Sequence, residues 1–384
     1  MTPPVLDALQ LNRATLARQG LLEPIADGSV AEVVARLGSL QAQHPDWPPF
    51  ALGTRLHPGH DVAELLEARQ RREVVRASLM RMTVHVVAAD DFWPMSTLTM
   101  PFRLDHFRIM YKVDPARSSL GRRLTKAHGA VLAAMREKPL AIADIDAILR
   151  AELGPRVEIP PHRALWRWFS GKVPLVLVPF EGEGYGRARY LPAADWLGPP
   201  PEGTDDPDAA AARLAERYLA AFGPASAEDY AAYVGRGRII GRLRAGVNDL
   251  GDRLVRFRDE SGRELVDLAD APRPPAETPA APRLLARWDS LLLSHATRHR
   301  TRVLPEAHRT TVITNNADVL PTFLVDGMVA GTWLPRHDQD GKPRIELRPF
   351  RRLRTADREA LEAEADRMLP VLRKGAFSRV AGTD

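Results

Sequence analysis

The order of the predicted elements constrains the fold of this chain more than any other feature of its sequence. Helix-forming segments followed by a pair of strand-forming segments occur three times. The first set comprises helices 4–19, 29–43 and 61–72 with strands 74–82 and 83–87. The second comprises helices 118–136, 143–153 and 161–171 with strands 173–180 and 187–191. The third comprises helices 208–222, 226–234 and 238–247 with strands 254–257 and 264–268. Three helices closed by a hairpin are the order of a winged helix, so we expect an α+β protein with three such modules in tandem.

Prolines mark the expected boundaries. Pro45, Pro48 and Pro49 predict that the second helix ends near Gln43. A second proline cluster, in residues 271–282, predicts a linker. Beyond it the sequence favours strands 310–314, 322–325, 328–333 and 344–349, then a helix 356–373. The expected organisation is winged-helix modules over 1–88, 89–200 and 207–271, followed by a small antiparallel β-rich region with a terminal helix over 283–384.

Composition excludes several classes of protein. The 384 residues contain no cysteine, which rules out disulfide scaffolds, thiolate zinc sites and cysteine nucleophiles. No run approaches ~18 consecutive apolar residues and the first residues lack a signal-peptide pattern, so we expect a cytoplasmic protein with no membrane contact. P-loop and His-Glu-x-x-His motifs are missing, and His295 and His299 lack an evident third ligand. We therefore expect neither a metal nor a cofactor.

The positive charge is carried by arginines at particular places. The chain has 54 Lys+Arg against 49 Asp+Glu, a net charge of +5. Two arginine pairs with a spacing of four lie on the predicted third helices of the second and third modules: Arg163 with Arg167, and Arg238 with Arg242. That spacing puts each pair on one helix face, and the third helix of such a module enters the major groove of DNA. A solvated charged face is the alternative, but the repeated placement favours double-stranded DNA as the partner of a monomeric chain.

The sequence Gln41-Ala42-Gln43 is the candidate for chemistry. Beyond the predicted helix end the backbone becomes extended, so side chains two residues apart project to the same side. Two neighbouring carboxamides can orient a water molecule without carrying charge. The residues alone leave open a simpler interpretation, a helix end formed by two good helix formers.

The stretch around this motif resembles a known family. Residues 37–55, with Gln41-Ala42-Gln43-His44-Pro45, are similar to bacterial AlkZ-type DNA glycosylases. Further resemblance lies in segments 79–87, 288–293, 302–305 and 324–333. It implies three tandem winged helices around a basic concave surface that binds duplex DNA, with Gln41 and Gln43 as the catalytic Gln-apolar-Gln motif. The chain departs from the pattern at Met82, where the family more often has glycine, and at Thr297, where an acidic residue is expected before Arg298.

The resemblance also implies further site residues and a reaction. It puts the strand with Arg81, Thr83 and His85 beside the glutamines, and their alternation predicts that all three face one side, with Arg81 and His85 lining the DNA surface. Arg298 is a further DNA-binding candidate. The implied reaction is monofunctional hydrolysis of the N-glycosidic bond of an N7-alkylated purine, including bulky adducts or crosslinks, for DNA repair or self-resistance. Such a base is cationic and leaves without a strong acid. The alternative is a non-enzymatic winged-helix DNA-binding protein or transcriptional regulator.

Overall fold

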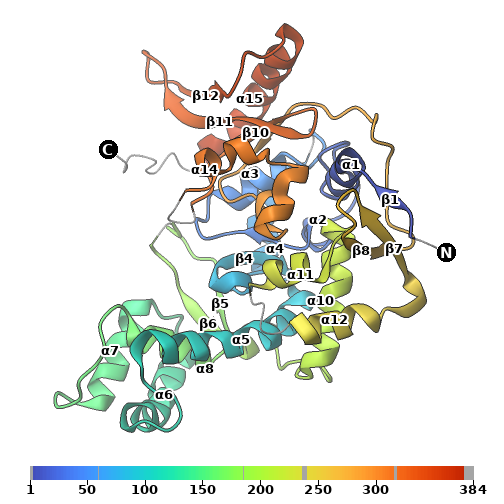
Figure 1. The fold of residues 1–384 in the computed structure, drawn as a ribbon. Helices are drawn as coiled ribbons and strands as arrows, with labels where there is room; N and C mark the ends of the chain where they lie inside the picture. Colours follow the sequence, from blue (N-terminus) through green and yellow to red (C-terminus); the bar gives the residue numbers. More distant parts are fainter. Residues whose placement is uncertain (1–2, 59, 185, 236–239, 315–317, 376–384) are drawn as a thin grey trace.

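The structure is a computed structural model that describes residues 3–58, 60–184, 186–235, 240–314 and 318–375. It is a mixed α+β fold, as expected (Figure 1). In Figure 1 helices α6–α8, within residues 119–172, lie at one end of the molecule, and the C-terminal sheet with α15 (Thr355–Gly375) lies at the other. None of the helices in this described part is both long and apolar enough to cross a membrane.

One order of elements recurs three times along the chain. A helix is followed by a short β segment, two helices and an antiparallel strand pair, and the short β segment pairs with the second strand each time. In the first repeat the elements are α2 (Val30–Leu37), β2 (Leu40–Gln41), α3 (Trp47–Gly53), α4 (Glu64–Gln70), β3 (Val74–Ser78) and β4 (Val84–Ala88).

The second and third repeats reduce the short β segment to a single bridge. The second consists of α6 (Ser119–Glu137), the Leu140–Tyr190 bridge, α7 (Ile142–Leu153), α8 (Ala164–Lys172), β5 (Leu175–Leu177) and β6 (Tyr190–Pro192). The third consists of α10 (Pro207–Phe222), the Ala225–Val266 bridge, α11 (Ala227–Val234), α12 (Ile240–Asn248), β7 (Leu254–Asp259) and β8 (Glu264–Leu268). A five-residue helix, α9 (Ala193–Leu197), follows the second repeat.

The first and second repeats share one sheet. Their strands form a five-stranded sheet of order β2-β4-β3-β5-β6, joined where β3 pairs antiparallel with β5. Glu183, from the loop between β5 and β6, accepts hydrogen bonds from Arg69 at 2.8 Å and Arg76 at 2.7 Å. All three side chains are nearly buried, so this ion cluster fixes one repeat against the other.

Three helices differ from the sequence predictions. The first helix is α1 (Ala8–Arg18); before it, residues Val5–Leu6 form β1, which pairs with β7 of the third repeat. The second predicted helix ends at Leu37, because Gly38 adopts φ 77°. The prolines do not keep the next segment irregular: Pro48 and Pro49 occupy the first turn of α3, where a missing N–H removes no helical hydrogen bond.

The sequence analysis missed α5 (Ala89–Tyr111), the longest helix among the described residues. Pro94 and Pro101 lie inside it and hide its helical character. Phe92, Met95 and Leu98 on α5 pack in one core with residues of α10–α12 and of β3 and β4. This helix therefore connects the first repeat to the second and also supports the third.

The C-terminal region is a four-stranded antiparallel sheet with a covering helix. Its strands are β9 (Arg283–Leu285), β10 (Thr322–Val325), β11 (Met328–His337) and β12 (Pro343–Pro349), in the order β12-β11-β10-β9. The expected strands 322–325 and 328–333 are joined by a tight turn, with Asp326 and Gly327 both at positive φ. Helices α13 (Ser290–Leu293) and α14 (Arg309–Val312) precede β10, and α15 (Thr355–Gly375) ends the fold.

The predicted strand at 310–314 is wrong. That segment contains α14, whose Val312 is buried in a core with Val303, Leu304 and Val319. Tertiary packing overrides the strand preference of the threonines and the valine there. A separate core packs Phe323, Trp333 and Leu361 of this region against the first repeat. The first repeat is thus covered by the C-terminal region through this core and by the third repeat through the core that contains α5.

Candidate active site

Gln41 and Gln43 lie on and just after a short strand, not at a helix end. Gln41 pairs with His85 on β4, and the amide of Ala42 donates to the carbonyl oxygen of Val84 at 2.7 Å. Side chains two residues apart on an extended chain face the same side of a sheet, which is the relation expected for the two carboxamides. Gln41 is 7% exposed and Gln43 is exposed, so the pair spans the boundary between the interior and solvent.

Hydrogen bonds fix both carboxamide oxygens. Gln41 Oε1 accepts from Arg81 Nη2 at 3.3 Å and, more weakly, from Thr83 Oγ1 at 3.5 Å. Gln43 Oε1 accepts from the backbone amide of Val84 at 3.2 Å. The turn and the first residue of β4 therefore orient both glutamines, and the site presents fixed neutral dipoles.

Arg81 is bound on three sides. Its Nη1 donates to the carbonyl oxygen of Tyr233 at 2.7 Å, and its Nη2 donates to Gln41 and to His85 Nε2, the latter at 3.1 Å. The guanidinium lies 5.7 Å from the centroid of the Tyr233 ring. Burial lowers the pKa of Arg81 to about 10, so it is charged at neutral pH. Both of its terminal nitrogens are therefore engaged within the protein.

His85 is a buried partner of Arg81. It is 0% exposed, and its Nδ1 lies 3.0 Å from the carbonyl oxygen of Thr83, which can only accept a hydrogen bond. Nδ1 therefore carries the proton, and Nε2 accepts from Arg81. Burial and then the charge of Arg81 hold the pKa of His85 well below its usual range, so the ring is neutral.

The prediction for Arg81, Thr83 and His85 is correct in one part and wrong in another. Arg81, Thr83 and His85 do gather beside Gln41, but Arg81 lies in the turn before β4 with φ 53°, so strand alternation is not the cause. The prediction that His85 lines the DNA surface is wrong, because its side chain has no exposed area. The buried imidazole of His85 is instead satisfied by two hydrogen bonds, one with Arg81 and one with the carbonyl oxygen of Thr83.

Residues far away in the sequence close the site. Tyr233 from α11 places its hydroxyl 3.1 Å from Ser39 Oγ, and Ser290 Oγ donates to the carbonyl oxygen of Ser39 at 2.9 Å. Next to them, Arg55 and Asp289 form a two-bond ion pair at 2.7 and 3.0 Å, with both side chains almost wholly buried. Removing one partner of such a pair costs about 3–5 kcal/mol of stability. The third repeat and the C-terminal region thus hold the strand that carries Gln41.

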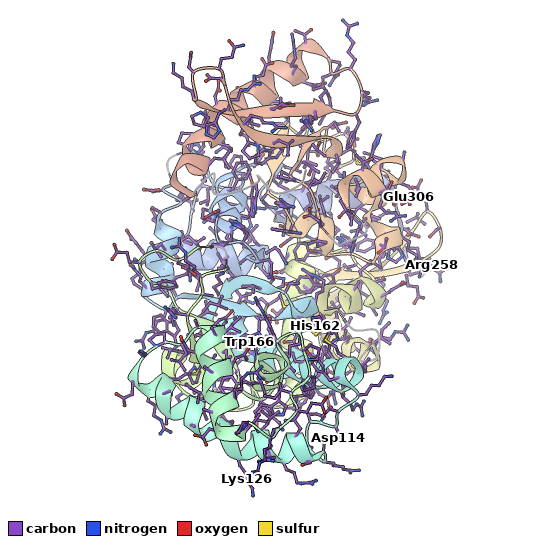
Figure 2. All side chains as sticks on the ribbon, turned by 90° about the vertical axis from the view of Figure 1, so that its left-hand side faces the viewer. Asp114, Lys126, His162, Trp166, Arg258 and Glu306 are labelled. Atoms are coloured by element: carbon purple, nitrogen blue, oxygen red, sulfur yellow. The ribbon has the colours of Figure 1, made fainter. Side chains whose placement is uncertain are left out.

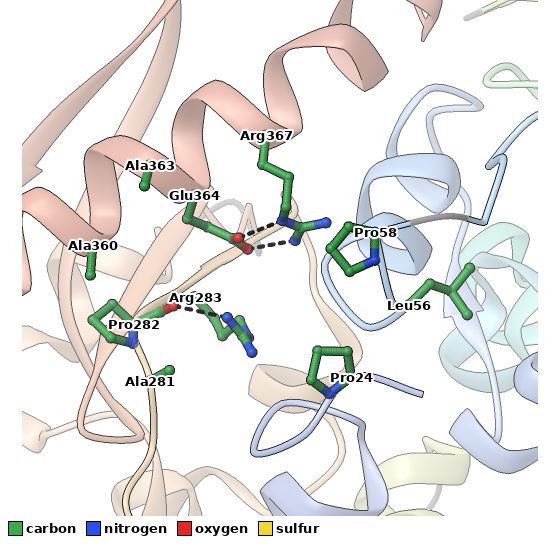
Figure 3. Close-up of a pocket in the computed structure, with 10 residues that line it drawn as sticks. All are labelled: Pro24, Leu56, Pro58, Ala281, Pro282, Arg283, Ala360, Ala363, Glu364 and Arg367. Atoms are coloured by element: carbon green, nitrogen blue, oxygen red, sulfur yellow. Dashed lines mark hydrogen bonds and ion pairs between the residues drawn. The ribbon is translucent and has the colours of Figure 1, made fainter. Parts of the chain in front are cut away.

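Within the described part of the chain, Gln41 lines a narrow cleft. The cleft that it lines with Leu40, Arg55, Trp288 and others is too narrow for a water molecule. A cavity of about 390 Å³ lies under α15, where Figure 3 shows Arg283 and the Glu364–Arg367 ion pair on its walls. Neither Gln41 nor Gln43 lines it.

A second cavity, of about 420 Å³, belongs to the opposite face of the shared sheet. Arg76 and Val86 line it together with Asp46. Leu40, Val86 and Arg76 form one row across the strands, and Gln41, His85 and Ala77 form the next row. Neighbouring rows face opposite sides of a sheet. Asp46, whose pKa burial raises to about 6, therefore lines a space that Gln41 does not face.

The DNA-binding candidates lie on separate elements. Arg163 and Arg167 are exposed at the start of α8, although Arg163 precedes the helix with φ 61°. Arg242 on α12 is exposed and bonds Asp208 at 2.6 Å, and Arg298 is exposed and paired with Glu228. Arg238 lies outside the described residues.

Among the described residues, no hydrogen bond joins Arg163, Arg167, Arg242 or Arg298 to the glutamines. Figure 2 shows the second repeat, with Lys126 and Asp114, at the opposite end of the molecule from the C-terminal region. The exposed arginines of α8 belong to that repeat, whereas Gln41 and Gln43 lie in the first.

The segment around Thr297 contains a network that the sequence did not reveal. Asp229 accepts from His299 Nδ1 at 2.6 Å and from the amide of Ala296 at 3.0 Å. Burial alone would raise the pKa of Asp229, but the His299 hydrogen bond and neighbouring positive groups hold it well below its usual range. His295 bonds the carbonyl oxygen of Phe222 at 3.1 Å, and burial lowers its pKa to about 3. Ser226 and Asp229 were recognisable only as a helix cap.

No group of three or more His, Cys, Asp or Glu side chains suited to a metal ion occurs within the described ranges. His295 and His299, the spaced pair in the sequence, are each bonded to a different acceptor of the protein.

Comparison with known proteins identifies the class. The model of the AlkZ-like DNA glycosylase family matches residues 34–371, so the chain belongs to this family and is an enzyme that hydrolyses N-glycosyl bonds in DNA repair. The alternative of a non-enzymatic regulator is therefore wrong.

Two relatives place the chain within this class. It is 28% identical over 336 residues to the interstrand DNA cross-link repair glycosylase of Streptomyces sahachiroi, covering 81% of this chain and 84% of that protein. Its fold is similar to the solved structure of the Streptomyces sahachiroi DNA glycosylase AlkZ, with a TM-score of 0.74 and 21% identity. That match covers 95% of this chain and 96% of the other.

Proposed function

We propose that this glycosylase releases N7-alkylated purines from duplex DNA, with Gln41 and Gln43 as its catalytic residues. The observation that carries the proposal is the pair of fixed carboxamide oxygens: Arg81 and Thr83 orient that of Gln41, and Val84 orients that of Gln43. Neutral oxygens held in this way can position a water molecule and stabilise positive charge that develops on the sugar.

The leaving group explains why two neutral residues suffice. An N7-alkylated purine is already cationic, so it departs as a neutral base and needs no strong general acid. The acidic residues near the motif are engaged elsewhere: Asp289 is paired with Arg55, and Asp46 lines the cavity on the other face of the sheet. The site is therefore suited to substrates that damage has already activated.

The narrow cleft at Gln41 supports hydrolysis without an extruded base in that cleft. A glycosylase that flips its target base needs a pocket that encloses it. The cleft that Gln41 lines has no room even for water. We propose that the glutamines reach the sugar while the adduct stays outside, so that bulky N7 adducts and interstrand crosslinks are accepted. This proposal agrees with the name of one relative, the interstrand DNA cross-link repair glycosylase of Streptomyces sahachiroi.

The three repeats support DNA binding as winged-helix modules. Each has the order helix, β segment, two helices and hairpin, and α8 and α12 are third helices with exposed arginines. A third helix enters the major groove and a wing contacts the backbone in this class of module. We infer that modules over 1–88, 89–200 and 207–271 form a basic surface that binds duplex DNA without sequence preference, and that the enzyme acts as a monomer.

A gel assay tests the proposal. The protein is incubated with a duplex that contains one 7-methylguanine, and half of each sample is heated in alkali to cleave abasic sites. We expect strand cleavage only after alkali, because no lyase step is proposed. Gln41→Ala and Gln43→Ala should give little cleavage. Failure of the wild-type protein to form alkali-labile sites in this duplex would contradict the proposed substrate.

A further inference from the structure

The turn between β3 and β4 has an unusual conformation for its residues. The amide of Thr83 donates to the carbonyl oxygen of Met80 at 3.0 Å, which makes Arg81 and Met82 the two central residues. Both lie in the left-handed region, with φ 53° and 58°. Hairpin turns with two such residues strongly favour asparagine and glycine, because other side chains crowd the backbone there.

Local contacts explain the left-handed backbone conformation of Arg81 but not that of Met82. The guanidinium of Arg81 is held by Tyr233, Gln41 and His85, and these bonds offset the strained backbone. Met82 is instead a large apolar side chain that is 38% exposed. A strained backbone that leaves a methionine in solvent points to a function for that side chain rather than to stability.

The turn holds Met82 next to the candidate active site. Its two neighbours in the chain, Arg81 and Thr83, both bond Gln41 Oε1. The end of α11 packs closely behind: a Cβ on Gly235, itself at φ 98°, would lie 2.7 Å from Arg81 Cα. The third repeat thus supports the turn, and Met82 is presented from a fixed position.

We propose that Met82 is an apolar wedge that enters the base stack at the lesion and brings the target sugar to Gln41 and Gln43. Proteins that distort duplex DNA insert methionine, leucine, isoleucine or phenylalanine between base steps, where these side chains replace part of the lost stacking. This inference rests on the proposed function, because it assigns a duplex substrate to the glutamines. It identifies a residue that contacts the DNA and sets the local opening at the damaged nucleotide.

Fluorescence reports the wedge directly. A duplex carries 2-aminopurine beside a tetrahydrofuran abasic-site analogue, and unstacking of 2-aminopurine raises its fluorescence. Wild-type protein should raise the signal on binding, Met82→Gly should not, and the conservative Met82→Leu should restore most of the rise. Leu9→Ala, at an apolar residue of α1 with 45% exposure, is the matched control and should behave as wild type.

Release rates and stability complete the test. Single-turnover release of 7-methylguanine should fall about tenfold in Met82→Gly, on the scale of losing one stacking contact, while the melting temperature stays the same or rises because glycine relieves the strain. A Met82→Gly protein with wild-type fluorescence and rate would overturn the wedge. If wild-type protein raises the fluorescence but releases no 7-methylguanine, the proposed substrate fails and the wedge stands.

Discussion

The first and second repeats have the same order of elements but differ in the exposure of the side chains to which we assign their functions. In the first repeat Gln41 and His85 are buried, and both terminal nitrogens of Arg81 form hydrogen bonds with other protein residues. In the second repeat Arg163 and Arg167 are exposed on α8. The second repeat has its own core, with Leu124, Val131 and Trp168 among its members, whereas residues of the first repeat are divided between two cores that it shares with other regions.

This difference in exposure indicates how the same order of elements can serve catalysis in one repeat and DNA binding in another. Two regions cover the first repeat, so the carboxamide of Gln41 lies in a largely dry environment, where its orientation is fixed and its electrostatic effect is strong, whereas Gln43 lies at the boundary with solvent. The second repeat meets the rest of the molecule through α5 and the shared sheet, and its arginines remain in solvent. We therefore expect the first repeat to carry out the chemistry and the second repeat to contribute to DNA affinity. Variants in each repeat can separate these two contributions.

The largest effect is expected at the glutamines. Gln41→Ala and Gln43→Ala should each slow base release on the order of 10²-fold or more, because each removes one oriented oxygen, while DNA affinity stays nearly unchanged. Single-turnover rates and fluorescence anisotropy measure the two quantities. Gln70→Ala, at an exposed glutamine of α4, controls for loss of a carboxamide. If both motif variants keep wild-type rates, the first repeat has no chemical role.

Arg81→Lys tests the support of Gln41. A lysine cannot reach Tyr233, Gln41 and His85 together, so Gln41 should lose its fixed orientation and release should slow about 10- to 100-fold. Affinity should change little, and Arg163→Lys, directly before α8, is the matched control. A selective loss of affinity would instead make Arg81 a DNA contact like the arginines of the second repeat.

The pH dependence of stability tests whether His85 is buried and neutral. Its pKa lies below that of an unfolded chain, so the unfolded state binds the proton first as the pH falls. His85 therefore stabilises the protein above its usual pKa near 6.5, and this contribution is lost as the pH drops below that value. Denaturant titrations at several pH values should show a shallower decline below pH 6.5 in His85→Asn than in wild type. Parallel declines would mean that His85 is solvated.

The smallest effects are expected on α8. Arg163→Ala and Arg167→Ala should each weaken duplex binding a few-fold and reduce the salt slope by about one, because each removes one phosphate contact. The rate of base release from the saturated complex should not change. Anisotropy titrations at several salt concentrations measure this, and unchanged slopes would remove α8 from the DNA interface.

The predictable parts of the fold were those set by local sequence. The helix caps at Ser29 and Ser226 and the turn at Asp326–Gly327 have short-range signals: an acidic residue three positions after each serine, and an Asp-Gly pair between two strand-forming segments. Prolines misled twice, because Pro48 lies in the first turn of α3 and Pro94 lies within α5. Their effect depends on position in the helix, which the residue type alone does not reveal.

The candidate site was also predictable only where its residues lie close together in the sequence. The glutamines and the turn with Arg81 lie within short motifs, so the resemblance to known glycosylases brings them together. Tyr233 and Ser290 reach Ser39 across about two hundred residues or more of chain, and no local pattern encodes such a contact. His85 was assigned to the surface because strand alternation gives the side of a sheet but not what covers it.

The leaving group provides the most direct test of the central claim that two fixed, neutral glutamines act on a base that is already cationic. Single-turnover release is measured from matched duplexes that contain 7-methylguanine, a bulky N7 adduct or uracil, with wild-type protein and with Gln41→Ala. We predict that wild type releases both N7-alkylated purines and no uracil, and that Gln41→Ala loses both activities together. Release of uracil at a rate close to that of 7-methylguanine would contradict the account, because neutral carboxamides do not activate an uncharged leaving group.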